Sequence, residues 1–276
     1  FAGQSTPWPV ALADQTTDPS LDEALRGHVA AAGRLLTPVA ADLLATTGRP
    51  VDLFGFAPNP ARLGAAADAT ASVEGVALTQ LGALLDLEHL GYSVAQAKPL
   101  AVLGHSQGVL AVHMTRAIEA AGSIEAAGKT LNEILAVAAL IGAAGTRRVR
   151  ELGLNPKYGE ASPMLSVKGA TREQVEALVA RVNNARGPIS IAVTNSDNHH
   201  VLSGYPEDLA AFALEAEREH QHQAKLREQK LHGGTVFNPT LEYLEVTLPF
   251  HSPLMADAVE QTVAWAGACG FDQKRT

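Results

Sequence analysis

Apolar residues recur at helical spacing over the first ninety residues of the chain. The spacing predicts one helix over residues 21–45, with Ser20 and Glu23 placed as a capping box at its start. It predicts a second helix over residues 73–90, capped by Ser72, and a glycine follows each of the two runs. The first third of the chain is therefore expected to be mainly helical.

A different pattern follows at residues 100–103, where four apolar residues come directly before Gly104. Such a run is typical of a strand that is buried on both faces, and a new helix is expected to begin at Val109. Strand, tight turn and helix in this order indicate an α/β fold with a parallel sheet. The apolar stretch at residues 134–146 is shorter than the ~18 residues that cross a bilayer, so it is interpreted as a buried helix.

After Pro163 the pattern changes to short strands that alternate with helices. The predicted order is β-α-β-β-α-β, which is that of a ferredoxin-like unit. We therefore predict a smaller subdomain at residues 162–249, inserted into a larger one formed by residues 1–161 and 250–276. Because the chain begins at Phe1 without a methionine, we expect it to be a piece of a longer polypeptide. The predicted strands are residues 164–167, 189–194, 200–203 and 241–248, and the predicted helices are residues 171–182 and 206–230.

Composition narrows the classes of function. The chain has 276 residues, and its 21 Lys and Arg against 29 Asp and Glu give a net charge of −8, which argues against nucleic acid as a partner. Hydrophobic residues make up 46% and charged residues 18%, so a disordered chain is excluded. Cys269 is the only cysteine, which excludes a disulfide framework and a cysteine-based zinc site. We expect a cytoplasmic protein that does not bind a membrane.

The segment from Gly104 to Gly108 reads Gly-His-Ser-Gln-Gly, a G-x-S-x-G pattern between the predicted strand and helix. In a nucleophile elbow, Ser106 would lie on a sharp turn, and side chains at Gly104 and Gly108 would collide with the neighbouring strand and helix. The helix N-terminus would direct amide hydrogens and a positive dipole toward developing negative charge. The alternative is an ordinary turn between a strand and a helix.

A serine nucleophile needs a base, and the chain has ten histidines. His251 follows the last predicted strand, where the chain rejoins the larger subdomain, so it can face the elbow. His105 adjoins Ser106 and is expected to line the pocket. His220 and His222 lie two residues apart on a helix and so on different faces, and no metal site is expected. Surface or hydrogen-bonded core positions are expected for His28, His89, His113, His199, His200 and His232.

Four motifs in chain order resemble the landmarks of the acyl-CoA:acyl-carrier-protein transacylase family, and the match spans nearly the whole chain. Gln107 follows Ser106 where stand-alone malonyl transferases usually carry leucine. This resembles the acetyltransferase domain of a bacterial or fungal type I fatty acid synthase. Ser5 departs from the glycine usual in the family. The motifs are Phe1-Ala2-Gly3-Gln4, Gly104-His105-Ser106-Gln107-Gly108, Asn195-Ser196 with Val201-Leu202-Ser203-Gly204, and Pro249-Phe250-His251-Ser252-Pro253-Leu254-Met255.

The resemblance implies an α/β-hydrolase-like parallel-sheet core with an inserted ferredoxin-like subdomain. It implies that Ser106 takes an acetyl group from acyl-CoA, with His251 as the base, and passes it to the phosphopantetheine thiol of an acyl carrier protein, which loads the starter unit in fatty acid synthesis. The backbone amides of Gln107 and Gln4 would form the oxyanion hole. Asn195 matches a family position near the cleft. No permanently bound cofactor is implied, and the partners would be the carrier protein and the other domains of a type I synthase.

Malonyl-selective relatives carry an arginine roughly 25 residues past the serine, which pairs with the free carboxylate of the substrate. Residues 120–128 resemble an insertion relative to the family, and with this insertion Ile141 takes the position of the arginine. A short uncharged acyl group is therefore expected. The only Lys or Arg residues between Ser106 and Arg147 are Arg116 and Lys129. Lys129 remains an alternative cation for a carboxylate.

Other functions remain open. One alternative is a malonyl or palmitoyl transacylase of the same family. A serine hydrolase or thioesterase would need an acid between the serine and the histidine, and the aspartates there, Asp197 and Asp208, fall in a turn and at a helix start. A catalytically silent docking domain of a megasynthase is the alternative outside enzymes.

Overall fold

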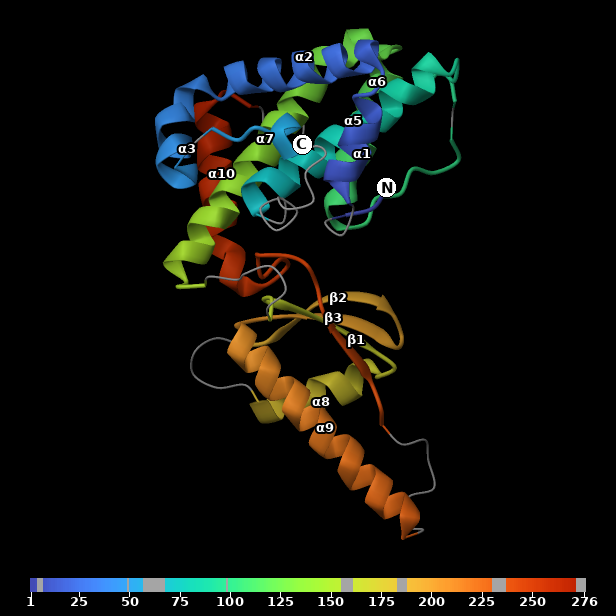
Figure 1. The fold of residues 1–276 in the computed structure, drawn as a ribbon, viewed down its shortest axis with the longest axis vertical. Helices are drawn as coiled ribbons and strands as arrows, with labels where there is room; N and C mark the ends of the chain where they lie inside the picture. The colour runs from blue at the N-terminus through green and yellow to red at the C-terminus, as the bar shows by residue number, and fades with distance from the viewer. Residues whose placement is uncertain are drawn as a thin grey trace. The chain divides into compact units, whose positions relative to one another are not determined.

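A computed structural model of the chain describes residues 1–3, 7–48, 50–56, 68–97, 99–154, 161–182, 188–229 and 237–271. The chain divides into two compact units (Figure 1). Unit 1 comprises Phe1–Arg148 and Ala258–Thr276, and unit 2 comprises Val149–Asp257. Unit 2 therefore extends beyond residues 162–249 at both of its ends.

Unit 1 is helical in its described residues, and α5 packs against α1, α2 and α6 within it. The ring of Trp8 on α1 lies so close to α5 that a Cβ on Gly75 would come within 2.5 Å of it. Leucines of α1, α2 and α5 are fully buried between these helices. The helices are α1 (Trp8–Gln15), α2 (Pro19–Leu35), α3 (Ala40–Thr47), α5 (Ala69–His89), α6 (Val109–Ala121), α7 (Ile124–Glu151) and α10 (Ala256–Ala268), the last two reaching the boundary with unit 2.

The predicted helix over residues 21–45 is two helices. A 3-10 turn at Thr37–Val39 separates α2 from α3, because Pro38 has no amide hydrogen to donate to the preceding turn. The predicted capping box is also wrong. Asp18 is the N-cap of α2, and its carboxylate accepts hydrogen bonds from the amides of Ser20, at 2.8 Å, and Leu21. The Ser20 hydroxyl also donates to this carboxylate, at 2.7 Å, and this bond together with those from the amides lowers the pKa of Asp18.

The second predicted helix begins earlier than expected. It is α5, and Asp68 rather than Ser72 is its N-cap, accepting a hydrogen bond from the amide of Thr70 at 2.9 Å. In both cases an aspartate upstream of the predicted serine takes the capping role, because a carboxylate is at least as good an acceptor for free helix amides.

The prediction of a doubly buried strand at residues 100–103 is wrong. Leu100 is fully exposed and Leu103 is 78% exposed, and no strand is assigned among the described residues of unit 1. The segment is paired along one edge: the Phe1 amino group donates to the Leu103 carbonyl at 2.8 Å, and the His105 amide donates to the Phe1 carbonyl at 3.0 Å. This is the hydrogen-bond pattern of parallel strands. The local pairing is parallel, but no described segment covers the leucines.

The buried helix predicted at residues 134–146 is confirmed as the middle of α7, where Leu135, Ala138 and Leu140 are fully buried. By length and composition alone α7 could cross a membrane, as could α2 taken together with the bent segment after it. In α7 more than half of the most apolar window, 56%, is buried within the protein. A core helix gives the same signal.

Unit 2 contains a four-stranded antiparallel sheet, and α8 and α9 cover one of its faces (Figure 1). The elements follow the predicted order along the chain. Only the last strand is clearly shorter than predicted, because the chain leaves the ladder after Tyr243. The sheet order is β2-β3-β1-β4. The elements are β1 (Met164–Lys168), α8 (Arg172–Val182), β2 (Ser190–Ser196), β3 (His199–Ser203), α9 (Pro206–Glu228) and β4 (Thr240–Tyr243).

The two faces of this sheet differ because successive side chains of a strand point to opposite sides. Leu165 and Val167 of β1 pack in the large core with α8 and α9, whereas Met164 belongs to a smaller apolar cluster that also holds Val246 and, at its edge, Phe250. The face that carries the smaller cluster is thus the one from which the chain continues toward His251.

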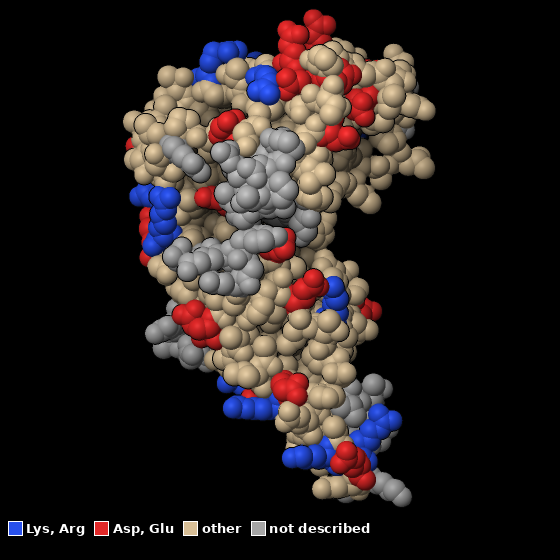
Figure 2. Space-filling view, in the orientation of Figure 1, with Lys and Arg blue, Asp and Glu red and all other residues tan. Residues whose placement is uncertain are grey.

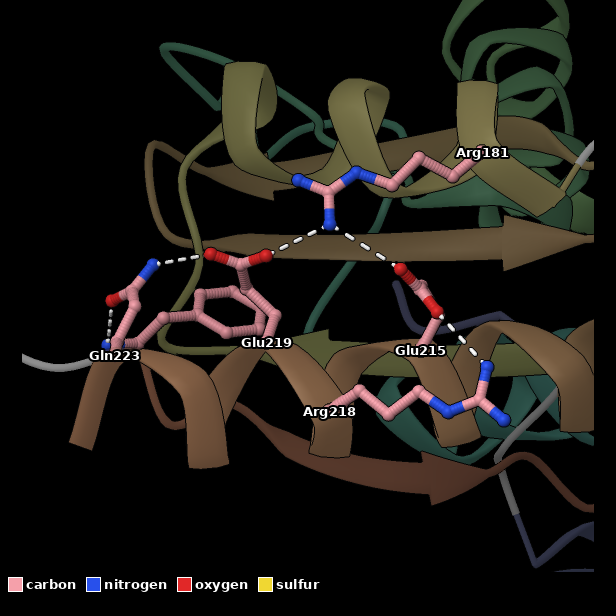
Figure 3. A network of polar contacts seen from close by, with 6 residues as sticks. Arg181, Glu215, Arg218, Glu219 and Gln223 are labelled. Carbon is pink, nitrogen blue, oxygen red and sulfur yellow. Dashed lines mark hydrogen bonds and ion pairs between the residues drawn. The ribbon is translucent and has the colours of Figure 1, made fainter. Parts of the chain in front are cut away.

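A network of ion pairs joins the two helices of unit 2 (Figure 3). Arg181 on α8 contacts Glu219 at 2.8 Å and Glu215 at 3.3 Å, both on α9, and Arg218 and Gln223 extend the network along α9. The Arg181 side chain is 49% exposed, so each pair contributes little to stability by itself. The network joins α8 to α9 at the surface, beside the apolar core that both helices share.

Charge on the surface is dispersed. On the face shown in Figure 2, Lys and Arg occur in small groups among uncharged side chains, and acidic side chains gather over the ends of α2 and α6. This face offers no broad basic surface for a polyanion, in agreement with the net charge of −8.

Candidate active site

Ser106 lies in a strained turn between the segment at residues 100–104 and α6. It opens a 3-10 turn, Ser106–Gly108, and its φ is 51°. A non-glycine residue in the left-handed region costs about 1–2 kcal/mol and persists only where the surroundings hold it. Among the described residues, the other non-glycine residue with a positive φ is His251, at 55°. The two residues singled out from the sequence as nucleophile and base are thus the two with this strain.

The glycines of the elbow are required by close backbone contacts. A Cβ on Gly104 would meet the carbonyl of Gly108 and would lie 2.6 Å from the amide nitrogen of Val109. A Cβ on Gly108 would meet the Phe1 carbonyl, with the carbon of that group at 2.9 Å. Real Cβ contacts are essentially never shorter than 3.0 Å, so only glycine fits at either position.

The N-terminal segment lies against the elbow. A Cβ on Gly3 would come within 2.9 Å of the His105 carbonyl oxygen and 3.2 Å of the Ser106 Cβ. Together with the bonds from Phe1, this brings the first motif of the chain beside the second. Gln4, the predicted oxyanion-hole residue, lies outside the described residues.

Two glutamines hold the elbow and the N-terminal segment onto α5. The side-chain amide of Gln107 donates to the Val73 carbonyl, and that of Gln80 donates to the Ala2 carbonyl at 2.7 Å. Gln80 was not singled out from the sequence, although a polar amide in an otherwise apolar helix is a signal that could have identified it. The backbone amide of Gln107 is at the N-terminal end of the turn that leads into α6, where the helix dipole is positive.

The two histidines predicted to contribute to the site lie in different units. His105 is exposed beside Ser106. His251 is exposed in unit 2, in a turn where the Ser252 hydroxyl donates to the Pro249 carbonyl at 2.7 Å, and the preceding Phe250 packs on the small apolar cluster of the sheet. Because Ser106 belongs to unit 1, the pairing of Ser106 with His251 stays a prediction.

Asn195 lies near the end of β2 beside a polar pair that the sequence did not suggest. Its side-chain amide is 3.5 Å from Nε2 of His199, and the Ser166 hydroxyl is 3.1 Å from the same nitrogen. Burial lowers the pKa of His199, and Lys168 and His200 lower it further, which favours the neutral imidazole. The cross-strand register that aligns β1 with β3 brings Ser166 to His199, and such a pairing cannot be found from spacing alone.

The residues relevant to acyl selectivity lie on α7 and α6. Ile141 is half-buried on α7, next to Gly142, whose Cβ would come 3.0 Å from the Cα of Thr70 on α5. Lys129 is 85% exposed and pairs with Glu133 at 3.8 Å, and Arg116 is 65% exposed. Neither cation lies in the interior.

The remaining candidates have structural roles or stay outside the site. His220 contacts the Phe237 carbonyl at 2.7 Å, and His222 is exposed. Asp208 is buried in the first turn of α9, where an acidic side chain is favourable, and Asp197 lies in the turn between β2 and β3. No group of three or more metal-ligating side chains occurs in the part of the chain that the structure describes.

Comparison with known proteins shows which family part of the chain resembles. Residues 163–243 match the family model described as the fatty acid synthase central AT domain. The chain is 29% identical over 163 residues to the fatty acid synthase beta subunit TOXC of Cochliobolus carbonum, and 32% identical over 170 residues to fatty acid synthase 2 of Mycosarcoma maydis. These matches support an assignment of the chain to the AT (acyltransferase) domain family of fatty acid synthases.

These alignments cover 54% and 57% of this AT-family chain but only 8% and 4% of the two relatives. The solved structure of MCAT from Streptococcus pneumoniae superimposes with a TM-score of 0.56 over 97% of this chain and 68% of that one, at 16% identity. At such identity the likeness shows the fold alone, an α/β fold rich in helices with a small antiparallel sheet. The family match lies within unit 2 and includes neither Ser106 nor His251.

Proposed function

We propose that this AT-family chain transfers an acetyl group from CoA to the phosphopantetheine thiol of an acyl carrier protein, through an ester on Ser106, and so loads the starter unit in fatty acid synthesis. The observation that carries the proposal is the strained turn at Ser106, closed by glycines that no larger residue can replace and joined to a helix N-terminus. A turn of this kind presents a serine hydroxyl to a substrate.

In the first half-reaction the Ser106 hydroxyl oxygen attacks the thioester carbonyl carbon while His251 takes the hydroxyl proton. The oxyanion is stabilised by the backbone amides of Gln107 and Gln4. The position of Gly3, the residue before Gln4, against Ser106 supports this assignment. The carbon–sulfur bond then breaks, and CoA leaves with the proton from His251.

In the second half-reaction the carrier thiol gives its proton to His251 and attacks the Ser106 ester. The ester bond breaks, the acyl group moves to the carrier sulfur, and the proton returns to the serine oxygen. Atoms and charges balance without a cofactor. The positive φ of His251 supports its role, because a strained backbone at a non-glycine residue is typical of functional sites. His105 and Asn195 are proposed to line the pocket.

The acetyl group is proposed because Ile141 carries no charge at the position where malonyl-selective relatives have an arginine. Lys129 and Arg116, the alternatives, are exposed and paired with glutamates on their own helices. An acyl carboxylate would then lose its hydration without gaining a partner, which costs several kcal/mol.

We also propose the subdomain division of the family: an α/β-hydrolase-like part at residues 1–161 and 250–276, and a ferredoxin-like part at residues 162–249. The sheet order β2-β3-β1-β4 with both helices on one face supports the second, and the parallel hydrogen bonds between Phe1 and the segment before the elbow support the first. The chain covers only 8% and 4% of the two relatives, which supports a multidomain synthase as the parent protein, and we propose that this protein is cytoplasmic.

The test is covalent labelling. After incubation with acetyl-CoA, we expect one acetyl mass on the peptide that contains Ser106, no label in Ser106→Ala, and a normal label in Ser93→Ala, a half-buried loop serine that serves as the control. Addition of a phosphopantetheinylated carrier should remove the label and produce acetyl-carrier. Rapid release of free acetate without the carrier would indicate a hydrolase instead, and no label with any acyl-CoA would indicate a silent domain.

A further inference from the structure

Glu74 is an unusual residue in helix α5. Every other residue from 69 to 82 is buried, and Glu74 is the only charged residue in this stretch. It is half-buried and has no ion pair or hydrogen bond with any residue that the structure describes. Burial raises the pKa of its carboxyl to about 7. A carboxylate without a partner in an apolar helix destabilises the fold and therefore calls for an explanation.

The position of Glu74 relates it to the candidate site of unit 1. Val73, the residue before it, accepts the hydrogen bond of Gln107 from the elbow. One turn earlier, Thr70 contacts α7 through a hydrogen bond of 2.7 Å to Thr146 and through the close approach of Gly142. The elbow and α7 therefore both contact the first two turns of α5, and Glu74 lies in the second of these turns.

Positions four apart on a helix share a face, so Glu74 follows Thr70 on the side of α5 that contacts α7. Ile141, next to Gly142 on α7, is the residue proposed to take the place of a carboxylate-binding arginine. Glu74 thus adds a charge of the same sign as an acyl carboxylate to this part of unit 1, and the basic side chains of α6 and α7 between Ser106 and Arg147 are exposed.

We propose that Glu74 is a specificity-determining residue that disfavours acyl groups bearing a carboxylate, such as malonyl, at Ser106. The inference rests on the proposed acyl transfer and adds a repulsive element to it: Ile141 removes the attraction for a carboxylate, and Glu74 opposes its entry. Selective sites commonly combine a missing attraction with an added repulsion.

The size of the effect follows from the proton equilibrium of Glu74. A carboxyl group with a pKa of about 7 can take up a proton when a second carboxylate approaches, and protonation removes the repulsion. At pH 8 the discrimination between malonyl and acetyl groups is therefore limited to about tenfold. The neutral isostere Glu74→Gln should therefore raise the malonyl-to-acetyl ratio of kcat/KM for labelling of Ser106 at pH 8 by up to about tenfold, with the acetyl rate little changed.

The experiment compares wild type, Glu74→Gln and Asp86→Asn with acetyl-CoA and malonyl-CoA at pH 8. Asp86 is an exposed acidic residue on the same helix, so Asp86→Asn removes the same charge and should leave the ratio unchanged. Circular dichroism and tryptophan fluorescence verify that each variant is folded. A purely structural Glu74 would change both rates together and not their ratio.

The outcomes separate the two proposals. The inference is supported if wild type is labelled by acetyl-CoA and if Glu74→Gln, but not Asp86→Asn, increases the malonyl-to-acetyl ratio of kcat/KM. Acetyl labelling with the same ratio in all three proteins, or the same increase in Asp86→Asn, would overturn the inference and leave the acyl transfer intact. A wild type that takes neither acyl group on Ser106 would overturn the proposed function, and the inference with it.

Discussion

Replacing Glu74 by glutamine should stabilise unit 1 at alkaline pH and much less at acidic pH. The side chain keeps its size and loses only its charge. In the folded protein, burial raises the pKa of Glu74 from 4.5 to about 7, so between these values the folded state binds more protons than the unfolded state. The free energy of unfolding therefore falls as pH rises through this interval and levels off above it.

The magnitude follows from the shift. Each unit of pKa corresponds to 1.36 kcal/mol, so a shift from 4.5 to about 7 corresponds to roughly 3 kcal/mol when it is fully expressed. Part of this loss of unfolding free energy is present already at pH 5. Because Glu74 is only half-buried, solvent screening reduces the remaining part. We expect Glu74→Gln to gain about 2 kcal/mol in unfolding free energy over wild type at pH 8 relative to pH 5.

The assay is urea unfolding followed by tryptophan fluorescence. Trp8 and Trp265 are the only tryptophans, both belong to unit 1, and the Trp8 ring lies on Gly75, next to Glu74. Asp86→Asn is the matched control and should follow wild type at both pH values. If Glu74→Gln and wild type differ by the same amount at pH 5 and pH 8, the carboxylate is not destabilised by burial and the reasoning fails.

Three further predictions concern the elbow, the base and selectivity. Gly108→Ala should destabilise unit 1 by about 1–3 kcal/mol and reduce acyl labelling, because the new Cβ would meet the Phe1 carbonyl; an unchanged urea midpoint would contradict the close contact. His251→Ala should reduce acyl transfer to the carrier by at least ~10³-fold, and near-normal turnover would point to another base. His222 is an exposed histidine of the same unit, so His222→Ala should keep the wild-type rate. Ile141→Arg should narrow the preference for acetyl-CoA over malonyl-CoA in kcat/KM, and no change in that ratio would place the acyl group elsewhere.

Local chemistry explains why parts of the fold and site could be predicted from the sequence. The elements of unit 2 follow from alternating apolar residues and turn residues that act over a few positions, and they occur in the predicted order. The glycines at positions 104 and 108 were expected on steric grounds, and their contacts are short because the turn at Ser106 is tight. These features depend on neighbours within about five residues.

Errors arose where two local signals competed. Ser20 and Ser72 both fitted a helix start, but Asp18 and Asp68 are the caps, because the helices extend further upstream than the apolar periodicity does. Pro38 was present in the sequence as a reason to divide the first helix, and the strong periodicity on both sides obscured it. In these cases the deciding residue was present locally, but the apolar periodicity pointed to a different helix boundary.

Burial and long-range pairing were decided by the tertiary structure alone. The apolar run at residues 100–103 specifies an extended segment but not whether another segment covers it, and Leu103 is exposed. The hydrogen bonds from Gln107 and Gln80 to α5, the pairing of Ser166 with His199, and the burial of the Glu74 carboxyl each depend on residues many positions apart in the chain. The sequence by itself determined the candidate residues and the local turn at Ser106, because residue type and local turn geometry depend on near neighbours. The tertiary structure decided which of them meet and how far each is removed from water, because these depend on the packing of whole elements.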